Sequence, residues 1–257
     1  MSSQMIKEQQ ELYPERRVKL TIEYDGTDFC GWQVQPEHRT VQGELENALK
    51  RLTGQKVTIY GSGRTDSGVH AIGQIAHITL PESKFNLLSL QKSLNGLTGK
   101  DIYVRDAEVV PDDFHARFDA KSRRYKYRLL KHPHPMLIKF SWFSDRIWDD
   151  KIARETSKKL KGKHSFKSFS RKREGEVDYK CEIFDATWTP TYYGASFEVE
   201  ADRFFHQMVR GLVGAIIDVA RGYLSNEEFL KLLHNPENNA EVRFVPPQGL
   251  VLLEVKY

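Results

Sequence analysis

The sequence predicts an α+β protein. Segments that alternate between apolar and polar residues, as strands do, are interspersed with segments whose apolar residues recur every three or four positions, as in helices. Both kinds of segment occur before and after Pro111. The chain has 257 residues, of which 39% are hydrophobic, and this is enough to bury one large core or two modest ones.

The first half of the chain carries the pattern of a ferredoxin-like unit. Alternating apolar residues from Val18 to Tyr24 predict a first strand, and an apolar stripe predicts a helix over 41–52 that ends near Gly54. Strand, helix, strand, strand, helix, strand is the order of such a unit. The remaining elements that we expect are strands at 57–60 and 74–80, a helix at 86–95 and a strand at 102–110.

The second half of the chain predicts a comparable set of elements, although no residue-level repeat links the two halves. A capping pair, Ser225 and Glu228, marks the start of the last helix. We therefore expect a tail at 1–16 that is disordered, an N-terminal subdomain at 17–111 and a C-terminal subdomain at 112–257. The elements expected beyond Pro111 are strands at 122–130, 177–188, 195–201 and 250–256, and helices at 149–161, 205–221 and 226–234.

The loop between the strands at 57–60 and 74–80 has the residues of a functional site. It reads Gly61-Ser-Gly-Arg-Thr-Asp66-Ser-Gly-Val-His-Ala71, with Arg64 and Asp66 two residues apart among three glycines. The Walker motif requires a Lys-Ser or Lys-Thr pair that is absent here, and a dinucleotide motif would continue into a helix. Asp66 can either make an Asx-turn with Arg64 as a passing ion-pair partner, or act as a nucleophile or general base.

Tyr125 lies in a predicted strand, Ser122-Arg-Arg-Tyr-Lys-Tyr-Arg-Leu-Leu130, that alternates strictly. Arg123, Tyr125 and Tyr127 share one face of this strand, and basic residues occupy the other. Basic side chains interleaved with aromatic ones suit RNA, which is bound through phosphate contacts and base stacking. Aromatic residues on a strand are also common in a protein core, so the residues alone leave both interpretations open.

Arg210 lies in the long amphipathic helix pattern at 205–221. It falls about 100° from Val209, at the edge of the apolar stripe. An arginine at this position either extends its side chain outward to water or binds a buried anion. His206 lies one turn earlier on the same row of the predicted helix, and the pattern assigns it no role.

Charge and cysteine content narrow the class of protein. The formal net charge is +4, so any basic surface that binds nucleic acid must be local. Cys30 and Cys181 are too few for a disulfide framework or a zinc site.

No apolar run is long enough for a signal peptide or a membrane span, which predicts a soluble, cytoplasmic protein. The basic clusters are Arg123 to Arg128, Lys158 to Lys163 and Arg171 to Arg173.

Six ordered blocks of this sequence resemble the TruA family of transfer RNA pseudouridine synthases. The match centres on Gly63-Arg-Thr-Asp66-x-Gly-Val-His70-Ala, which is similar to the active-site signature of that family, and it extends over nearly all of the chain from Val18 to Tyr257. Small departures are Ser67, where many relatives carry alanine, and Gly211 after Arg210. The other blocks are Glu23-Tyr-Asp-Gly26, then Gly31-Trp-Gln33 with Thr40-Val-Gln42, Pro111-Asp-Asp-Phe-His-Ala-Arg-Phe118, Arg123-Arg-Tyr-Lys-Tyr127, and Phe205-His-Gln-Met-Val-Arg210 with Gly249-Leu250.

The resemblance implies a reaction in which the N1 to C1′ bond of a uridine breaks and C5 is joined to C1′. Asp66 matches the essential aspartate of the family, and three mechanisms stay open: attack on C1′, addition to C6 and formation of a glycal. Arg64 matches an arginine that holds the RNA once the target base is turned out, which costs a few kcal/mol of unstacking. Tyr125 matches a tyrosine that packs against the target base, and Arg210 matches an arginine that pairs with the aspartate. Neither a metal nor an organic cofactor is expected.

The resemblance also implies partners and an arrangement of the halves. Two ferredoxin-like halves are expected to share an extended, mostly antiparallel sheet flanked by helices, with an active-site cleft between them. The expected substrate is tRNA, at uridines 38 to 40 of the anticodon stem-loop, and the enzyme is expected to be a homodimer with no membrane or small-molecule cofactor. The alternative is a catalytically silent tRNA-binding protein of the same fold.

Overall fold

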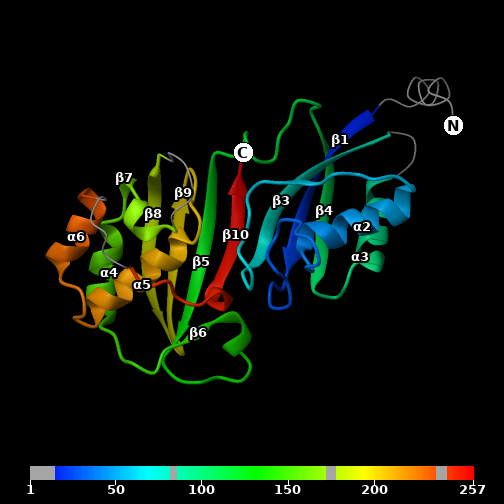
Figure 1. Ribbon diagram of the computed structural model, residues 1–257. Helices are drawn as coiled ribbons and strands as arrows, with labels where there is room; N and C mark the ends of the chain where they lie inside the picture. The colour runs from blue at the N-terminus through cyan, green and yellow to red at the C-terminus, as the bar shows by residue number, and fades with distance from the viewer. Residues whose placement is uncertain (1–14, 82–85, 172–177, 236–241) are drawn as a thin grey trace. The chain divides into compact units, whose positions relative to one another are not determined.

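The computed structural model describes residues 15–81, 86–171, 178–235 and 242–257, which are drawn in colour in Figure 1. The chain forms two compact units that meet in sequence between Ala120 and Lys121, and each is described by itself. The predicted tail at 1–16 lies outside the described residues except for its last two, which already belong to the first strand. Residues 112–120, which we assigned to the C-terminal subdomain, belong to the first unit.

The first unit is an antiparallel sheet with two helices. The strand order is β4-β1-β3-β2, and each of the three neighbouring pairs is antiparallel. Figure 1 shows α2 and α3 side by side on this sheet. The elements, in chain order, are β1 (Glu15–Tyr24), α2 (Val41–Thr53), β2 (Tyr60–Gly61), β3 (His70–Pro81), α3 (Leu87–Leu97) and β4 (Ile102–Val110).

The core of the first unit follows from the alternation seen in the sequence. β1 buries every second side chain from Val18 to Tyr24, because successive side chains of a strand point to opposite faces. The helix α2 contributes Val41, Leu45 and Leu49, which lie on one stripe and are fully buried. The Thr40 hydroxyl caps its first turn, and Gly54 ends it in a left-handed conformation.

The second unit contains a larger sheet. Its strand order is β10-β5-β9-β8-β7, and β6 adds to β5 as a parallel strand. Short 3₁₀ turns occur at 138–140, 167–169 and 247–249. The elements are β5 (Ser122–Leu130), β6 (Trp142–Phe143), α4 (Asp150–Lys158), β7 (Gly162–Ser165), β8 (Lys180–Thr191), β9 (Gly194–Ala201), α5 (Met208–Ala220), α6 (Asn226–His234) and β10 (Leu250–Lys256).

The two units share one topology. In the second unit β5, α4, β8, β9, α5 and β10 follow one another as β1, α2, β2, β3, α3 and β4 do in the first, and the strand order β10-β5-β9-β8 matches β4-β1-β3-β2. This is the ferredoxin-like order. The predicted α+β class and the two ferredoxin-like halves are therefore confirmed; the second half carries β6, β7 and α6 as additions.

Two predicted elements differ from the structure in ways that bear on the candidate site. The strand expected at 57–60 is reduced to β2, and residues 57–59 have no regular structure. The helix expected at 205–221 begins at Met208, because Gln207 has a φ of 59° and interrupts the helical backbone. His206 therefore lies before α5 and not one turn back on its surface. Most of the basic stretch Arg171 to Arg173 lies outside the described residues.

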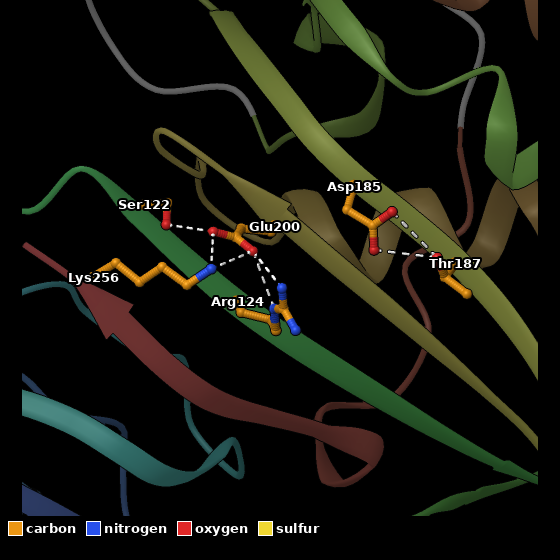
Figure 2. Close-up of polar contacts among 6 residues, drawn as sticks. All are labelled: Ser122, Arg124, Asp185, Thr187, Glu200 and Lys256. Atoms are coloured by element: carbon orange, nitrogen blue, oxygen red, sulfur yellow. Dashed lines mark hydrogen bonds and ion pairs between the residues drawn. The ribbon is translucent and has the colours of Figure 1, made fainter.

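A buried carboxylate ties three strands of the second unit together. Glu200 of β9 accepts hydrogen bonds from Ser122 Oγ at 2.6 Å and Arg124 Nη2 at 2.6 Å, both from β5, and from Lys256 Nζ of β10 at 2.8 Å (Figure 2). Burial alone would raise the pKa of Glu200, but these hydrogen bonds outweigh it and lower the pKa to about 2. Glu200 is therefore ionised at neutral pH. Figure 2 also shows Asp185 and Thr187, which bond to each other along the neighbouring strand.

Candidate active site

The Asp66 loop spans residues 62–69, between β2 and β3, and its first half is fastened to β3. The Ser62 backbone N–H donates to the carbonyl of Ile75 at 2.7 Å, and its hydroxyl donates to Gln74 Oε1 at 2.8 Å. Gln74 then donates through Nε2 to the Gly63 carbonyl at 3.1 Å. Gln74 is fully buried, so these bonds are shielded from water and hold the start of the loop in place.

The second half of the Asp66 loop is held by the loop at 25–33, which follows β1. The carbonyl of Thr65 accepts from the backbone N–H of Trp32 at 3.1 Å, and the Thr65 hydroxyl bonds to the Tyr24 hydroxyl at 2.8 Å. Thr65 and Tyr24 are both buried. The residue immediately before Asp66 is thus fixed through its backbone and its side chain.

The residues after Asp66 are fixed in the same way. The carbonyl of Phe29 accepts from the backbone N–H of Gly68 at 3.3 Å and from the Ser67 hydroxyl at 3.1 Å. The Ser67 hydroxyl therefore gives the Phe29 carbonyl a second donor, which an alanine at this position would lack. Gly68 has a φ of 75°, which the turn around Asp66 requires.

Two glycines allow the two loops to approach so closely. A Cβ atom on Gly26 would lie 2.0 Å from the carbonyl oxygen of Val69, and one on Gly31 would lie 2.6 Å from that of Thr65. Gly31 also has a φ of 87°. The sequence contained both glycines within blocks that resemble the family, but their role as the support of the Asp66 loop was not predicted. The nearest signal in the sequence was the position of the two glycines, which flank Phe29, with Gly31 directly before Trp32.

Asp66 itself lies in a turn whose ends are fixed. Its backbone carbonyl accepts from the N–H of Val69 at 3.2 Å, and its side chain is half-buried. Arg64, two residues earlier, is exposed and donates through Nε to Gln33 Oε1 at 2.9 Å. The structure therefore brings Asp66 and Arg64 into one loop, as predicted, and Gln33 is an orienting partner of Arg64 that the sequence did not reveal. A carboxylate in such a fixed turn is suited to nucleophilic or general-base chemistry.

Tyr125 is in the second unit, on β5 between β10 and β9. It lies opposite Leu252 and Val199 in the two neighbouring strands and is 8% exposed. Its ring packs edge-on against Phe204, with centroids 5.0 Å apart. The predicted sharing of a face by Tyr125 and Tyr127 is confirmed, and both side chains are buried.

Tyr127 is a core residue with a fixed hydroxyl. It donates to the carbonyl of Pro246 at 2.7 Å. Burial raises its pKa well above the ordinary value, and the nearby positive charges of Arg210 and Arg243 lower it only in part. Tyr127 is therefore neutral at physiological pH and acts as a hydrogen-bond donor.

Arg210 lies in the first turn of α5 and is half-buried. Its Nε donates to the carbonyl of Val245 at 2.7 Å, and its own carbonyl accepts from the Val245 N–H at 3.4 Å. The carbonyls of two adjacent residues, Val245 and Pro246, thus accept hydrogen bonds from Arg210 and Tyr127 respectively. Asp66 and Arg64 belong to the first unit, and Tyr125 and Arg210 to the second.

The glycine after Arg210 is required by packing. A Cβ atom on Gly211 would lie 2.2 Å from the carbonyl oxygen of Phe169. The absence of a side chain at Gly211 therefore lets α5 lie directly on the 3₁₀ turn at 167–169. Close packing at this point fixes the start of the helix that carries Arg210.

Neither cysteine takes part in a disulfide. Burial raises the pKa of the Cys181 thiol to about 12, with a smaller contribution from the negative charge of Asp202, so Cys181 is not a nucleophile at neutral pH. Within residues 15–81, 86–171, 178–235 and 242–257, no group of three or more His, Cys, Asp and Glu side chains is placed to hold a metal ion.

The fold and these groups define an α+β protein with a carboxylate on a fixed loop and an arginine two residues before it. A family profile described as tRNA pseudouridine synthase matches residues 20–119 and 156–257. The chain belongs to this family, and as a member it is an isomerase that acts on tRNA. In the part of the chain that the structure describes, no helix is long and apolar enough to cross a membrane.

Curated relatives agree with the family match over almost their whole length. The chain is 39% identical to tRNA pseudouridine synthase A of Bacillus subtilis (strain 168), with 94% of this chain and 99% of that protein covered. It is 36% identical to the protein of the same name from Chlorobium phaeovibrioides, with 93% and 99% covered. A solved structure, the crystal structure of a Cbf5-Nop10-Gar1 complex, aligns with a TM-score of 0.35 at 10% identity and covers 77% of this chain and 53% of that one.

Proposed function

We propose that this enzyme converts uridines at positions 38 to 40 of the tRNA anticodon stem-loop to pseudouridine, with Asp66 as the essential carboxylate. The observation that supports this proposal is the fixed turn that holds Asp66 half-buried, with both neighbouring residues bonded to the loop at 25–33. A nucleophile or base gains most from such fixation, because chemistry is fast only when the reacting atoms are held in place.

The other three site residues are proposed to bind the substrate. Arg64 is exposed and oriented by Gln33, so its planar cation can enter the space left by an extruded base or contact a phosphate. Tyr125 offers a ring whose orientation is set by Phe204. Arg210 is half-buried and held by the Val245 carbonyl, which suits the binding of an anionic group.

The test is release of tritium from tRNA labelled at uracil C5, measured without added metal or cofactor. We expect release with the wild type and none above background with Asp66→Asn, while tRNA binding at the same salt concentration stays within about threefold, because the carboxylate carries chemistry and basic side chains carry affinity. Asp145→Asn, which alters an exposed carboxylate of the second unit, is the matched control and should retain wild-type release.

Two outcomes would contradict the proposal. Equal loss of binding and of folding in Asp66→Asn would remove the catalytic assignment. Binding of tRNA by the wild type without tritium release from any tRNA tried would favour the silent binding protein. Sequencing of the product at positions 38, 39 and 40 then tests the predicted region.

The homodimer and a cytoplasmic place of action are proposed on the family resemblance alone. Sedimentation of the purified chain, with and without tRNA, tests the dimer. A monomer under both conditions would contradict it.

A further inference from the structure

A continuous run of aromatic rings starts at Tyr60, just before the Asp66 loop in the sequence, and its residues have no role in the proposed reaction. Tyr60 of β2 stacks on His77 of β3 with ring centroids 5.1 Å apart and planes 15° apart. His77 contacts His115 at 4.8 Å, and His115 contacts Phe118 at 4.3 Å. Tyr60 and Gly61 form β2, which directly precedes the loop that carries Asp66.

The run of rings is buried at its centre and open at its ends. His77 is 3% exposed, whereas Tyr60 is 51% and Phe118 76% exposed. A phenylalanine that keeps three quarters of its surface in water contributes little to the core, so its ring is accessible to a ligand. The inner rings form a support on which the outer rings rest.

The loop that carries Phe118 is rigid. The ring of His115 accepts through Nδ1 from the backbone N–H groups of Arg117 at 3.2 Å and Phe118 at 3.4 Å, and the backbone N–H of His115 donates to Asp119 Oδ2 at 2.7 Å. This internal network closes the loop on itself. Phe118 is therefore exposed because the loop presents it and not because the loop is loose.

The same loop is fastened to the sheet at two points. Arg17 Nη1 of β1 donates to the Phe114 carbonyl at 2.7 Å, and the Ala116 N–H donates to Nδ1 of His77 at 3.1 Å. A fixed, exposed ring loses little conformational freedom when it binds a ligand. This is the property expected of a preformed binding surface.

We propose that Phe118, supported by His115, His77 and Tyr60, is a stacking platform for an unpaired nucleobase of the tRNA. Flat aromatic faces bind unstacked bases of any identity. The guanidinium of Arg117 lies over the Phe118 ring in a cation–π contact, 5.8 Å from its centroid, and is close enough to reach the phosphate next to a base stacked on that ring. The proposal rests on the tRNA activity proposed above and adds a contact that the four site residues do not provide.

An RNA base fits this surface better than a second copy of the chain does. Protein interfaces of this kind are built from several apolar side chains, whereas this platform has a single highly exposed apolar ring beside a cation, backed by rings with polar edges. Binding of a second copy of the chain at this surface is one of the outcomes that the test distinguishes.

The experiment measures tRNA binding and KM for Phe118→Ala, Phe118→Trp and the wild type at one salt concentration. Removal of a base-stacking ring costs about 1 to 3 kcal/mol, so Phe118→Ala should raise Kd and KM by about 5- to 150-fold with little change in kcat, and Phe118→Trp should restore both. Tyr192→Ala, which removes a 94% exposed ring of the second unit, is the matched control and should bind like the wild type.

A scan of the RNA identifies the base. Unpaired nucleotides of the tRNA are replaced one at a time by abasic residues, and binding is measured with both the wild type and Phe118→Ala. One position should weaken binding to the wild type by the factor seen for Phe118→Ala and should add nothing in that variant, because both changes remove the same contact.

Four outcomes would overturn the platform: wild-type binding by Phe118→Ala, an equal loss in Tyr192→Ala, full additivity at every abasic position, or a fall in oligomeric state in Phe118→Ala. Binding does not require turnover, so the platform is tested even if no tritium is released. Failure of isomerisation and failure of the platform are therefore separate results.

Discussion

Gly31 is the residue on which the position of Asp66 depends most directly. Its φ of 87° and the 2.6 Å that would separate a Cβ atom from the Thr65 carbonyl both exclude a side chain. We expect Gly31→Ala to lower the free energy of unfolding by about 2 kcal/mol or more, from backbone strain together with the clash, and to reduce tritium release further than this loss of stability explains. Urea denaturation and tritium release from the same preparation measure the two effects.

Gly63→Ala is the control for Gly31→Ala, since a Cβ atom on Gly63 meets nothing within 4 Å. The free energy of unfolding of Gly63→Ala should lie within about 0.5 kcal/mol of the wild-type value. Equal stability of the two variants would show that the loop at 25–33 does not constrain the Asp66 turn.

His77 makes stability depend on pH in a defined window. Burial, with the positive charges of His115 and Arg17, lowers its pKa from 6.5 to about 4. Between these two values the unfolded chain binds a proton that the folded chain does not, so the free energy of unfolding should fall as the pH drops from 6.5 towards about 4 and then level off. Thermal unfolding at half-unit steps of pH measures this slope.

Replacement of His77 by glutamine should flatten that slope, because glutamine keeps an acceptor for the Ala116 N–H without titrating. His38→Gln, at an exposed histidine, should leave the slope unchanged. An unchanged slope in His77→Gln would assign the pH dependence to other groups.

At the scale of the elements, Glu200 is the strongest link between strands in the second unit. Glu200→Gln keeps the shape of the side chain but leaves Arg124 and Lys256 without their counter-ion. Both cations retain access to water, with side chains 36% and 44% exposed, so we expect a loss of about 1 to 3 kcal/mol of unfolding free energy in urea rather than the full cost of an isolated buried charge.

Glu198→Gln provides the comparison for Glu200→Gln. Glu198 lies two residues away on the same face of β9 and pairs with Lys126 at 3.0 Å, but its side chain is 34% exposed. Loss of this pair, whose carboxylate is more accessible to water than that of Glu200, should cost less than about 1 kcal/mol. A cost as large as that of Glu200→Gln would mean that burial does not set the strength of these links.

Some elements were predicted with their observed first and last residues, because short stretches of sequence carry the signal for them. The capping pair Ser225 and Glu228 marked the start of α6, strict alternation marked β5, and the bounds predicted for α6, β5 and β10 agree with the structure. The start of α5 was missed because the φ of Gln207 leaves no trace in the apolar pattern. The short length of β2 was missed because residues 57–59 are β-branched or apolar and still form no ladder.

The sequence predicted the residues of the candidate site but not the contacts that hold the Asp66 loop in place. Glycines around Arg64 and Asp66 marked the loop, and the family resemblance selected the carboxylate. The contact between the loops at 25–33 and 62–69 runs mainly through backbone groups of Phe29, Trp32 and Thr65, and backbone contacts between distant segments carry no side-chain signature. The repeated topology of the two units was foreseen from element order alone, with no similarity of residues between them.

For the whole molecule, the balance of charge predicts how tRNA binding responds to salt. The chain has 39 Lys and Arg residues against 35 Asp and Glu residues, so affinity for a polyanion must arise from local groups of basic side chains. Each phosphate that such a side chain neutralises releases counter-ions and contributes roughly 0.7 to 0.9 to the slope of log Kd against log salt. We expect a linear plot with a slope of several units, a KM that rises in parallel, and a kcat that barely changes.

The same titration separates chemistry from binding. Asp66→Asn should give the wild-type slope, because a carboxylate neutralises no phosphate, whereas Arg117→Gln should lower the slope by about 1 if that guanidinium contacts a phosphate beside the Phe118 platform. Phe118→Ala should shift the whole line to weaker binding without changing its slope, because stacking releases no counter-ions. A slope near zero in the wild type would instead mean that contacts to bases carry the affinity of the whole molecule for tRNA.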